Sequence, residues 1–320
     1  MTKMKRLPLL PLLCALLFAP AASAQWSPAG NKIRSPWGEQ LNPDRVLPEY
    51  PRPMMERSRW MNLNGLWSYA LIEAGAPQPE TFEGEILVPF AIESALSGVG
   101  RRVSADQEIL YQRTFDIPSS WRGERVLLHF GAVDWKADVW VNGIQVGSHT
   151  GGYTPFSFDI TAALAHRGSN TLTVRVWDPT DKSYHPHGKQ ASKPEHIWYT
   201  PVSGIWQTVW LEPVPESHIA SLAVEPDLDR MTLLVTASVE APSPGDLLTA
   251  EVFDNGVKIA SASSINSQPL AIRMPSDTRL WSPDDPYLYE LKITLRNGGK
   301  PIDEVAGYAA MRPKFVTLHL

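Results

Sequence analysis

Cysteine is nearly absent from this chain of 320 residues, in which Cys14 stands alone. A single cysteine excludes an internal disulfide, so the folded domains must rely on the hydrophobic cores that their length allows. Long apolar runs are lacking too: the longest, residues 7–18, is shorter than the roughly 20 residues that cross a bilayer. With 20% charged and 43% hydrophobic residues, the composition excludes a disordered chain and a membrane-embedded one.

Basic residues are also in the minority, with 29 Lys and Arg against 34 Asp and Glu. Three of them, Lys3, Lys5 and Arg6, precede the apolar run, and Ala22 and Ala24 follow it with the small-x-small spacing of a signal-peptidase site. We therefore expect a signal peptide over residues 1–24, cleavage near Ala24, and a secreted or periplasmic protein. Because the leader holds three basic residues and no acidic one, cleavage changes the net charge from −5 to −8. Such an acidic protein is not expected to bind nucleic acid.

A lipid anchor on Cys14 is the alternative interpretation of the leader. Leu13 stands where a small residue would be expected, and few apolar residues lie upstream. Cleavage of a signal peptide therefore remains the prediction, and we expect no association of the mature chain with a membrane.

Residues 25–59 are rich in proline, arginine and tryptophan and have no helical period, so we expect an extended lead-in on the protein surface. From residue 60 onward short segments alternate between apolar and polar residues, as β-strands do. The pair Asn142-Gly143 between two of these segments is typical of a two-residue hairpin. The pattern predicts a jelly-roll sandwich over residues 60–214, with strands at residues 65–69, 110–117, 125–130, 137–141, 171–177 and 206–211.

Pro213 and Pro215 bracket one residue and predict a domain boundary, because a central strand cannot continue through two prolines. A second series begins at His218 and has further strands at residues 233–239, 248–253 and 287–295. About seven strands in roughly a hundred residues is the size of an immunoglobulin-like sandwich, which we expect over residues 215–312. No βα repeat and no long amphipathic helix is visible, so the predicted fold class is all-β.

Tryptophan is abundant, with 12 residues. Trp67, Trp140, Trp177 and Trp210 lie inside the alternating strands, and we expect these four in the core.

An ordered series of motifs runs through residues 55–312. The motifs are LNGLW (63–67), VPF (88–90), YQRTF (111–115), LHFGAVD (128–134), VWVNG (139–143), GGYTPF (151–156), NTLTVRV (170–176), SGIWQTVWL (203–211) and LWSPDDPYLY (280–289). In these the first domain resembles the sugar-binding jelly roll of glycoside hydrolase family 2, the group of β-galactosidases, β-glucuronidases and β-mannosidases. The last motif resembles the immunoglobulin-like domain that follows in that family. The resemblance implies carbohydrate as the partner and a role in carbohydrate metabolism.

Asp134 and Trp135 are the first candidates for sugar contact. They follow a strand that leaves through Gly131 and precede the hairpin strand at residues 139–141. This order is expected to present both side chains at a sheet edge, where an aromatic face and a charged group suit a sugar.

A long polar loop, residues 181–199, carries the remaining candidates, His187, Lys189 and Trp198. Long loops without secondary structure are usually functional or disordered. In complete members of the family that this chain resembles, the corresponding loop leans toward the mouth of the catalytic barrel, which implies the same placement here. A solvated loop that packs on a missing partner domain is the alternative.

His185 and His187 could also form half of a zinc site. No cysteine or second pair of ligands completes such a site in the sequence. We therefore predict no metal and no cofactor.

No catalytic residue is assigned. Retaining glycosidases need two carboxylates about 5–5.5 Å apart, and the resemblance implies that both come from a (β/α)8 barrel, which takes about 250 residues. The acid/base glutamate of the family follows an asparagine, and no Asn-Glu dipeptide occurs in this sequence. We expect a chain that is inactive alone, with residues 313–320 as the aberrant tail of a truncated gene product.

Three functions remain open. The chain is the non-catalytic carbohydrate-recognition portion of a family 2 glycosidase, complemented by a separately encoded barrel or prone to self-association. Alternatively, it is a free-standing periplasmic carbohydrate-binding protein. The third function is a purely structural module of two β-sandwiches.

Overall fold

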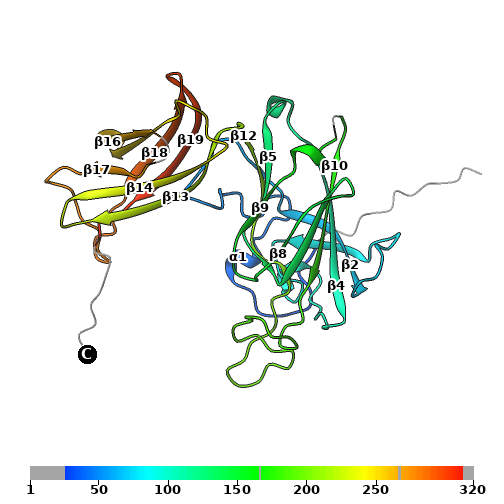
Figure 1. The fold of residues 1–320 in the computed structure, drawn as a ribbon. Helices are drawn as coiled ribbons and strands as arrows, with labels where there is room; N and C mark the ends of the chain where they lie inside the picture. The colour runs from blue at the N-terminus through cyan, green and yellow to red at the C-terminus, as the bar shows by residue number, and fades with distance from the viewer. Residues whose placement is uncertain (1–25, 166, 266–267, 313–320) are drawn as a thin grey trace, which may run out of the picture.

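The computed structural model describes residues 26–165, 167–265 and 268–312. The predicted signal peptide with Cys14 and the predicted tail at residues 313–320 lie outside the described residues. All pairs of named strands are antiparallel, and they form two sandwiches that meet at one junction (Figure 1). No helix in the described ranges is long and apolar enough to cross a membrane.

The first sandwich packs a six-stranded sheet against a four-stranded one. The larger sheet contains, in spatial order, β3 (Gly84–Val88), β2 (Gly65–Glu73), β4 (Gln107–Phe115), β10 (Asn170–Trp177), β7 (Lys136–Val141) and β8 (Ile144–Thr150). The smaller sheet contains β1 (Met61–Asn62), β12 (Val209–Val214), β5 (Arg125–Phe130) and β9 (Phe156–Asp159). A separate two-stranded ladder joins β6 (Val133–Asp134) to β11 (Gly204–Ile205).

The second sandwich has three strands in one sheet and four in the other, the number of strands in a constant-type immunoglobulin domain. The first sheet contains β13 (His218–Asp227), β14 (Thr232–Glu240) and β17 (Leu270–Arg273). The second contains β16 (Val257–Ile265), β15 (Leu247–Asp254), β18 (Tyr289–Asn297) and β19 (Lys300–Ala309). The predicted fold class, a jelly roll followed by an immunoglobulin-like sandwich, is confirmed.

Helical structure in the described residues is confined to single turns. The lead-in contains α1 (Pro36–Glu39), whose first turn is capped by the side chain of Ser35. Three 3₁₀ turns follow in the first sandwich: η1 (Ala95–Ser97), η2 (Ser119–Trp121) and η3 (Thr161–Ala163). The rest of the lead-in, from residue 26 to residue 60, consists of turns, bends and irregular chain.

Alternation along the strands decides which side chains form the core. In β10, Leu172, Val174 and Val176 are fully buried between the sheets. The residues between them point to the outer face, because successive side chains of a strand lie on opposite faces. Trp177 is among these outward residues and is half-buried.

The prediction of four core tryptophans is therefore wrong for two of them. Trp67 and Trp210 are buried, whereas Trp140 and Trp177 lie on the outer face of the six-stranded sheet. For Trp140 the reason is its parity: Val139 and Val141 on either side of it are fully buried, so its own side chain must point outward.

Pro213 lies within a strand, although two prolines were expected to prevent one. β12 runs to Val214 and pairs with β5 through Pro213, opposite Val126. On its other side β1 pairs with β12 only at Trp210 and Leu211. Pro213 thus lies where β12 has a single partner strand, and its missing N–H is tolerated at such an edge.

The lead-in joins the two sandwiches through Met55, Glu56 and Arg57. Met55 belongs to the second core, and Glu56 pairs with Ala306 of β19 through two backbone hydrogen bonds of 2.7 and 2.9 Å. Arg57 forms an ion pair with Asp303 of β19, and its Nη2 donates to the carbonyl oxygen of Ile219 at 2.7 Å. One segment of the lead-in therefore contacts both sheets of the second sandwich.

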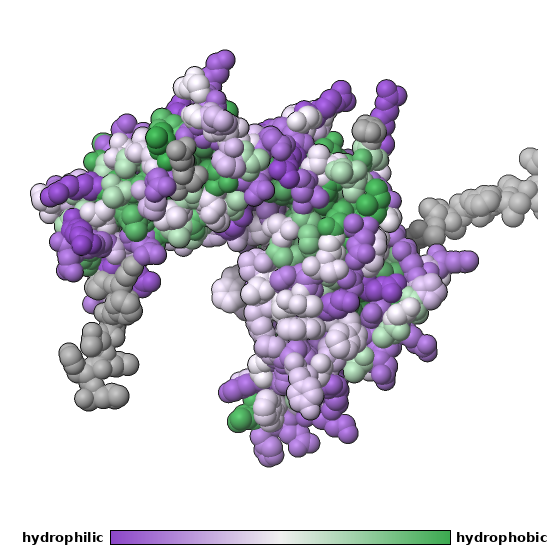
Figure 2. All heavy atoms as spheres, viewed as in Figure 1, coloured by the Kyte–Doolittle hydropathy of each residue, from purple (hydrophilic) through white to green (hydrophobic). Residues whose placement is uncertain are grey.

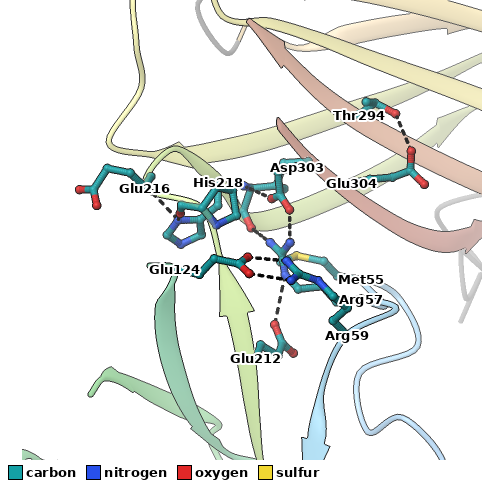
Figure 3. A network of polar contacts seen from close by, with 12 residues as sticks. Met55, Arg57, Arg59, Glu124, Glu212, Glu216, His218, Thr294, Asp303 and Glu304 are labelled. Carbon is teal, nitrogen blue, oxygen red and sulfur yellow. Dashed lines mark hydrogen bonds and ion pairs between the residues drawn. The ribbon is translucent and has the colours of Figure 1, made fainter. Parts of the chain in front are cut away.

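Glu212 connects this segment to the first sandwich (Figure 3). Its carboxylate lies on β12, is fully buried, and is 3.2 Å from Arg57 Nε and 3.0 Å from Arg52 Nη2. The hydroxyl of Tyr50 donates to the same carboxylate, and His129 Nε2 lies 3.5 Å away. Burial alone would raise the pKa of Glu212, but His129, Arg52 and Tyr50 outweigh it and hold this pKa at about 2. The junction is therefore built around one buried carboxylate that stays charged.

Replacing this carboxylate tests its role. Glu212→Gln keeps the shape of the side chain but removes the only counter-charge of Arg52 among the described residues and leaves the buried Arg57 with Asp303 alone. Breaking a buried ion pair from one side costs about 3 kcal/mol, so we expect a loss of that size in the free energy of unfolding by urea. Glu124→Gln is the matched control, because its partner Arg59 is half exposed and such pairs contribute about 0.5 kcal/mol. Equal losses in the free energy of unfolding for the two variants would contradict the role of Glu212 at the junction.

Candidate functional site

Asp134, a predicted site residue, lies at the base of a hollow and not at an exposed sheet edge. It ends β6 and is opposite Gly204 of β11. Its side chain is 2% exposed and packs so closely on Gly152 that a Cβ added there would lie 2.3 Å from Asp134 Oδ1. The expected exposure of Asp134 is wrong, because the β6–β11 ladder and Gly152 cover this turn.

The hollow beside Asp134 has a volume of about 230 Å³. Tyr153 and Trp206 form an aromatic wall, with ring centroids 6.1 Å apart, and Trp206 Nε1 donates to the carbonyl oxygen of Gly152 at 2.7 Å. The rest of the lining comes from one loop and the segment after it: Lys189, Gln190, Tyr199, Thr200 and Val202. An aromatic wall facing a few polar groups is the usual composition of a small-molecule site.

Gln190, to which the sequence analysis gave no role, fixes the loop against the hollow. Its Nε2 donates to Asp134 Oδ2 at 2.8 Å and to the Tyr153 hydroxyl at 3.3 Å. Its Oε1 accepts from the backbone N–H of Val202 at 2.6 Å. The side chain is buried, and its hydrogen bond to Asp134 is shielded from water, whereas the other two are partly buried. One glutamine in a polar loop carries no sequence pattern that would have identified it.

The loop over residues 181–199 is ordered by such contacts. Gln190 and Tyr199 form a parallel bridge, and Asp181 Oδ2 accepts from the backbone N–H and the hydroxyl of Ser192, each at 3.2 Å. Arg102, from outside the loop, donates to the carbonyl oxygen of Ser192 at 3.1 Å. Figure 1 shows this loop at the end of the first sandwich that is remote from the second, and in Figure 2 it projects into solvent as a mostly polar surface.

The structure brings two of the five predicted residues, Asp134 and Lys189, to the same hollow. Trp135 and His187 lie in a neighbouring cluster around His185. The centroid of the His185 ring is 4.6 Å from that of Trp135 and 5.8 Å from that of His187. Within the described residues no group of three or more His, Cys, Asp or Glu side chains is placed to hold a metal ion.

Trp198, the fifth predicted residue, lies near the hollow but not in its wall. Its side chain is 45% exposed, and the next residue, Tyr199, lines the hollow. An incoming ligand could therefore contact the indole ring of Trp198 only at the rim.

Two buried carboxyl groups in this region share an unusual state of protonation. Burial raises the pKa of Asp134 to about 7; the hydrogen bond from Gln190 opposes this rise and the charge of Asp178 adds to it. Burial likewise raises the pKa of Glu93 to about 7, although the Ser203 backbone N–H donates to Glu93 Oε2 at 3.0 Å. Asp178 Oδ2 accepts from the Ser203 hydroxyl at 2.6 Å. Ser203 therefore links the carboxyl groups of Glu93 and Asp178.

These pKa values predict a stability that depends on pH. The folded chain keeps a proton on Asp134 up to about pH 7, whereas the unfolded chain releases it near pH 4, so the stability that Asp134 contributes is lost as the pH rises between these values. Asp134→Asn removes the group that titrates. We expect its midpoint of thermal unfolding, relative to the wild type, to rise by about 8 °C between pH 5 and pH 8, because about two pH units of titration at roughly 1.4 kcal/mol each amount to roughly 2.7 kcal/mol. A difference that does not change with pH would contradict the raised pKa.

Comparisons with known proteins agree with this architecture. The family profile "Glycosyl hydrolases family 2, sugar binding domain" matches residues 100–215, and the profile "Glycosyl hydrolases family 2" matches residues 217–312. A β-glucuronidase of Paenibacillus borealis is 25% identical over 253 residues, which are 73% of this chain and 42% of the relative. A β-galactosidase of Thermoanaerobacter pseudethanolicus is 30% identical over 195 residues, which are 58% of this chain and 25% of the relative.

Solved structures with a similar fold include two β-glucuronidases. The enzyme of Ruminococcus gnavus in complex with D-glucuronic acid superposes with a TM-score of 0.63 at 21% identity, over 81% of this chain and 47% of that one. The enzyme of Lactobacillus rhamnosus gives a TM-score of 0.63 at 23% identity, over 79% of this chain and 44% of that one. The chain thus spans less than half the length of these relatives.

Proposed function

Because the chain belongs to glycosyl hydrolase family 2, we propose that residues 26–312 are the non-catalytic carbohydrate-recognition portion of a family member. One observation carries this proposal: the hollow in which Tyr153 and Trp206 face Asp134. A sugar ring placed there can stack on the aromatic wall and direct its hydroxyls toward the Tyr153 hydroxyl and the Lys189 ammonium, which line the same hollow. Asp134 lies buried behind them and holds Gln190 in place.

Recognition without cleavage follows from the chemistry that the site offers. Hydrolysis with retention needs two carboxylates about 5–5.5 Å apart, one charged as a nucleophile and one as an acid. The raised pKa of Asp134, about 7, leaves this carboxyl only about half ionised at neutral pH, and its Oδ2 accepts a hydrogen bond from Gln190. In this family the catalytic carboxylates belong to a barrel, and residues 26–312 fold as two sandwiches.

The names of the relatives narrow the ligand class. The proteins that match are called β-glucuronidases and β-galactosidases. We therefore propose a β-linked glucuronide or galactoside as the ligand of this portion. Stacking and a few hydrogen bonds at a shallow site contribute on the order of 1 kcal/mol each, so weak binding is expected.

The proposal also includes export of the chain from the cytoplasm and a protein partner for its long loop. The leader directs the chain to a secreted or periplasmic location, with cleavage near Ala24. The loop over residues 181–199 is mostly polar but exposes Tyr184, Ile197, Trp198 and Tyr199, and these side chains are the contacts that we propose for another protein surface. That surface is a separately encoded catalytic barrel or a second copy of the chain.

Variants of single tryptophans test the sugar site. We expect Trp206→Ala and Trp198→Ala each to weaken the affinity for a β-glucuronide or β-galactoside about fivefold, because an aromatic contact of this kind contributes about 1 kcal/mol. Trp281→Ala, in the second sandwich, is the control and is expected to bind like the wild type. Titration calorimetry measures the affinities, and circular dichroism checks that each variant is folded. Unchanged affinity in both site variants would refute the assignment.

A further inference from the structure

A second hollow, of about 400 Å³, lies on the other side of residues 200–202. Thr200 and Val202 line both hollows, so one short segment separates them. The opposite wall comes from the lead-in, from Lys32 to Ser35, and the floor from residues next to η1, among them Glu93 and Ser94. A ligand longer than one ring could therefore extend from the Asp134 hollow into this one.

Two positive charges at the second hollow lack partners. No carboxylate among the described residues forms an ion pair with Lys32 or Arg34, although other lysines and arginines in that part of the chain form 14 ion pairs. Arg34 Nε is moreover buried without a hydrogen-bond partner. A buried donor of this kind costs free energy unless a ligand or water satisfies it.

Glu93 supplies a third unsatisfied group from the floor. Its side chain is 4% exposed, and Glu93 Oε2 accepts from the Ser203 backbone N–H at 3.0 Å. Glu93 Oε1 has no partner among the described residues. The floor thus offers one buried oxygen to a hydroxyl group, beneath a wall with two unpaired cations.

We propose that this hollow is a second saccharide subsite that takes an acidic sugar unit, with its carboxylate or sulfate against Lys32 and Arg34 and a hydroxyl on Glu93 Oε1. The proposal rests on the proposed sugar-binding function and adds to it a separate site with its own charge preference. An arginine and a lysine together suit an anionic group, because guanidinium forms paired hydrogen bonds with carboxylate and ammonium adds a point charge.

Nuclear magnetic resonance on the purified chain tests this subsite with two monosaccharides of the same stereochemistry, D-glucuronate and D-glucose. We expect glucuronate to shift the backbone amide signals of residues 32–35 and 91–96 at concentrations at least fivefold lower than glucose does. The double variant Lys32→Gln, Arg34→Gln should remove this preference. The matched control, Arg122→Gln with Lys300→Gln, removes two positive charges outside the hollow and should retain it.

The outcomes separate this inference from the proposed function. Equal shifts by both sugars, no shift at residues 32–35 and 91–96, or a preference that survives the double variant would overturn the acidic subsite. In the same spectra, the amide signals of Gln190 and Trp206 report on the first hollow. If neither sugar shifts these signals, the result would count against the proposed function instead. A glucuronate response that weakens as salt is added would support the role of the two cations.

Discussion

The buried carboxylate of Glu212 is the constraint on which the arrangement of the two sandwiches depends. A charge in this position would be costly without partners, and the lead-in supplies them from Tyr50, Arg52 and Arg57. Arg57 also engages Asp303 and the Ile219 carbonyl in the second sandwich. The lead-in is therefore part of both domains, and its path past the first sandwich also brings Lys32 and Arg34 to the wall of the second hollow.

In the candidate site, too, single side chains connect several segments of the chain. Gln190 links the floor residue Asp134 to the Val202 backbone, so one amide fixes both the loop and the segment that divides the two hollows. Ser203, one residue later, holds Glu93 and Asp178. Raised pKa values of Asp134 and Glu93 follow from this burial. The same packing thus shapes the pockets and reduces the negative charge that would repel an acidic sugar.

Much of the fold could be predicted from the sequence, because local rules determine it. The hairpin at Asn142-Gly143 has φ values of 51° and 80° at these residues, the left-handed conformation that the Asn-Gly pair favours, and Asn255-Gly256 repeats it with 48° and 77°. Parity within β7 could also have placed Trp140 outside, had its neighbours been considered. Gln190 and Glu93 could not have been found, since their roles arise from contacts with residues far away in the sequence, namely Asp134 and Ser203.

The central claim is that this portion recognises a sugar without cleaving it. A saturation-transfer experiment followed over time tests this claim most directly. A β-glucuronide is mixed with the purified chain, and saturation transferred from the protein to the sugar protons is recorded by nuclear magnetic resonance over several hours. The account predicts transfer to the ring protons of the intact glycoside and no growth of signals from free glucuronate. Release of free glucuronate that disappears when a carboxylate of this chain is replaced, or the absence of any transfer to glucuronide and galactoside alike, would contradict it.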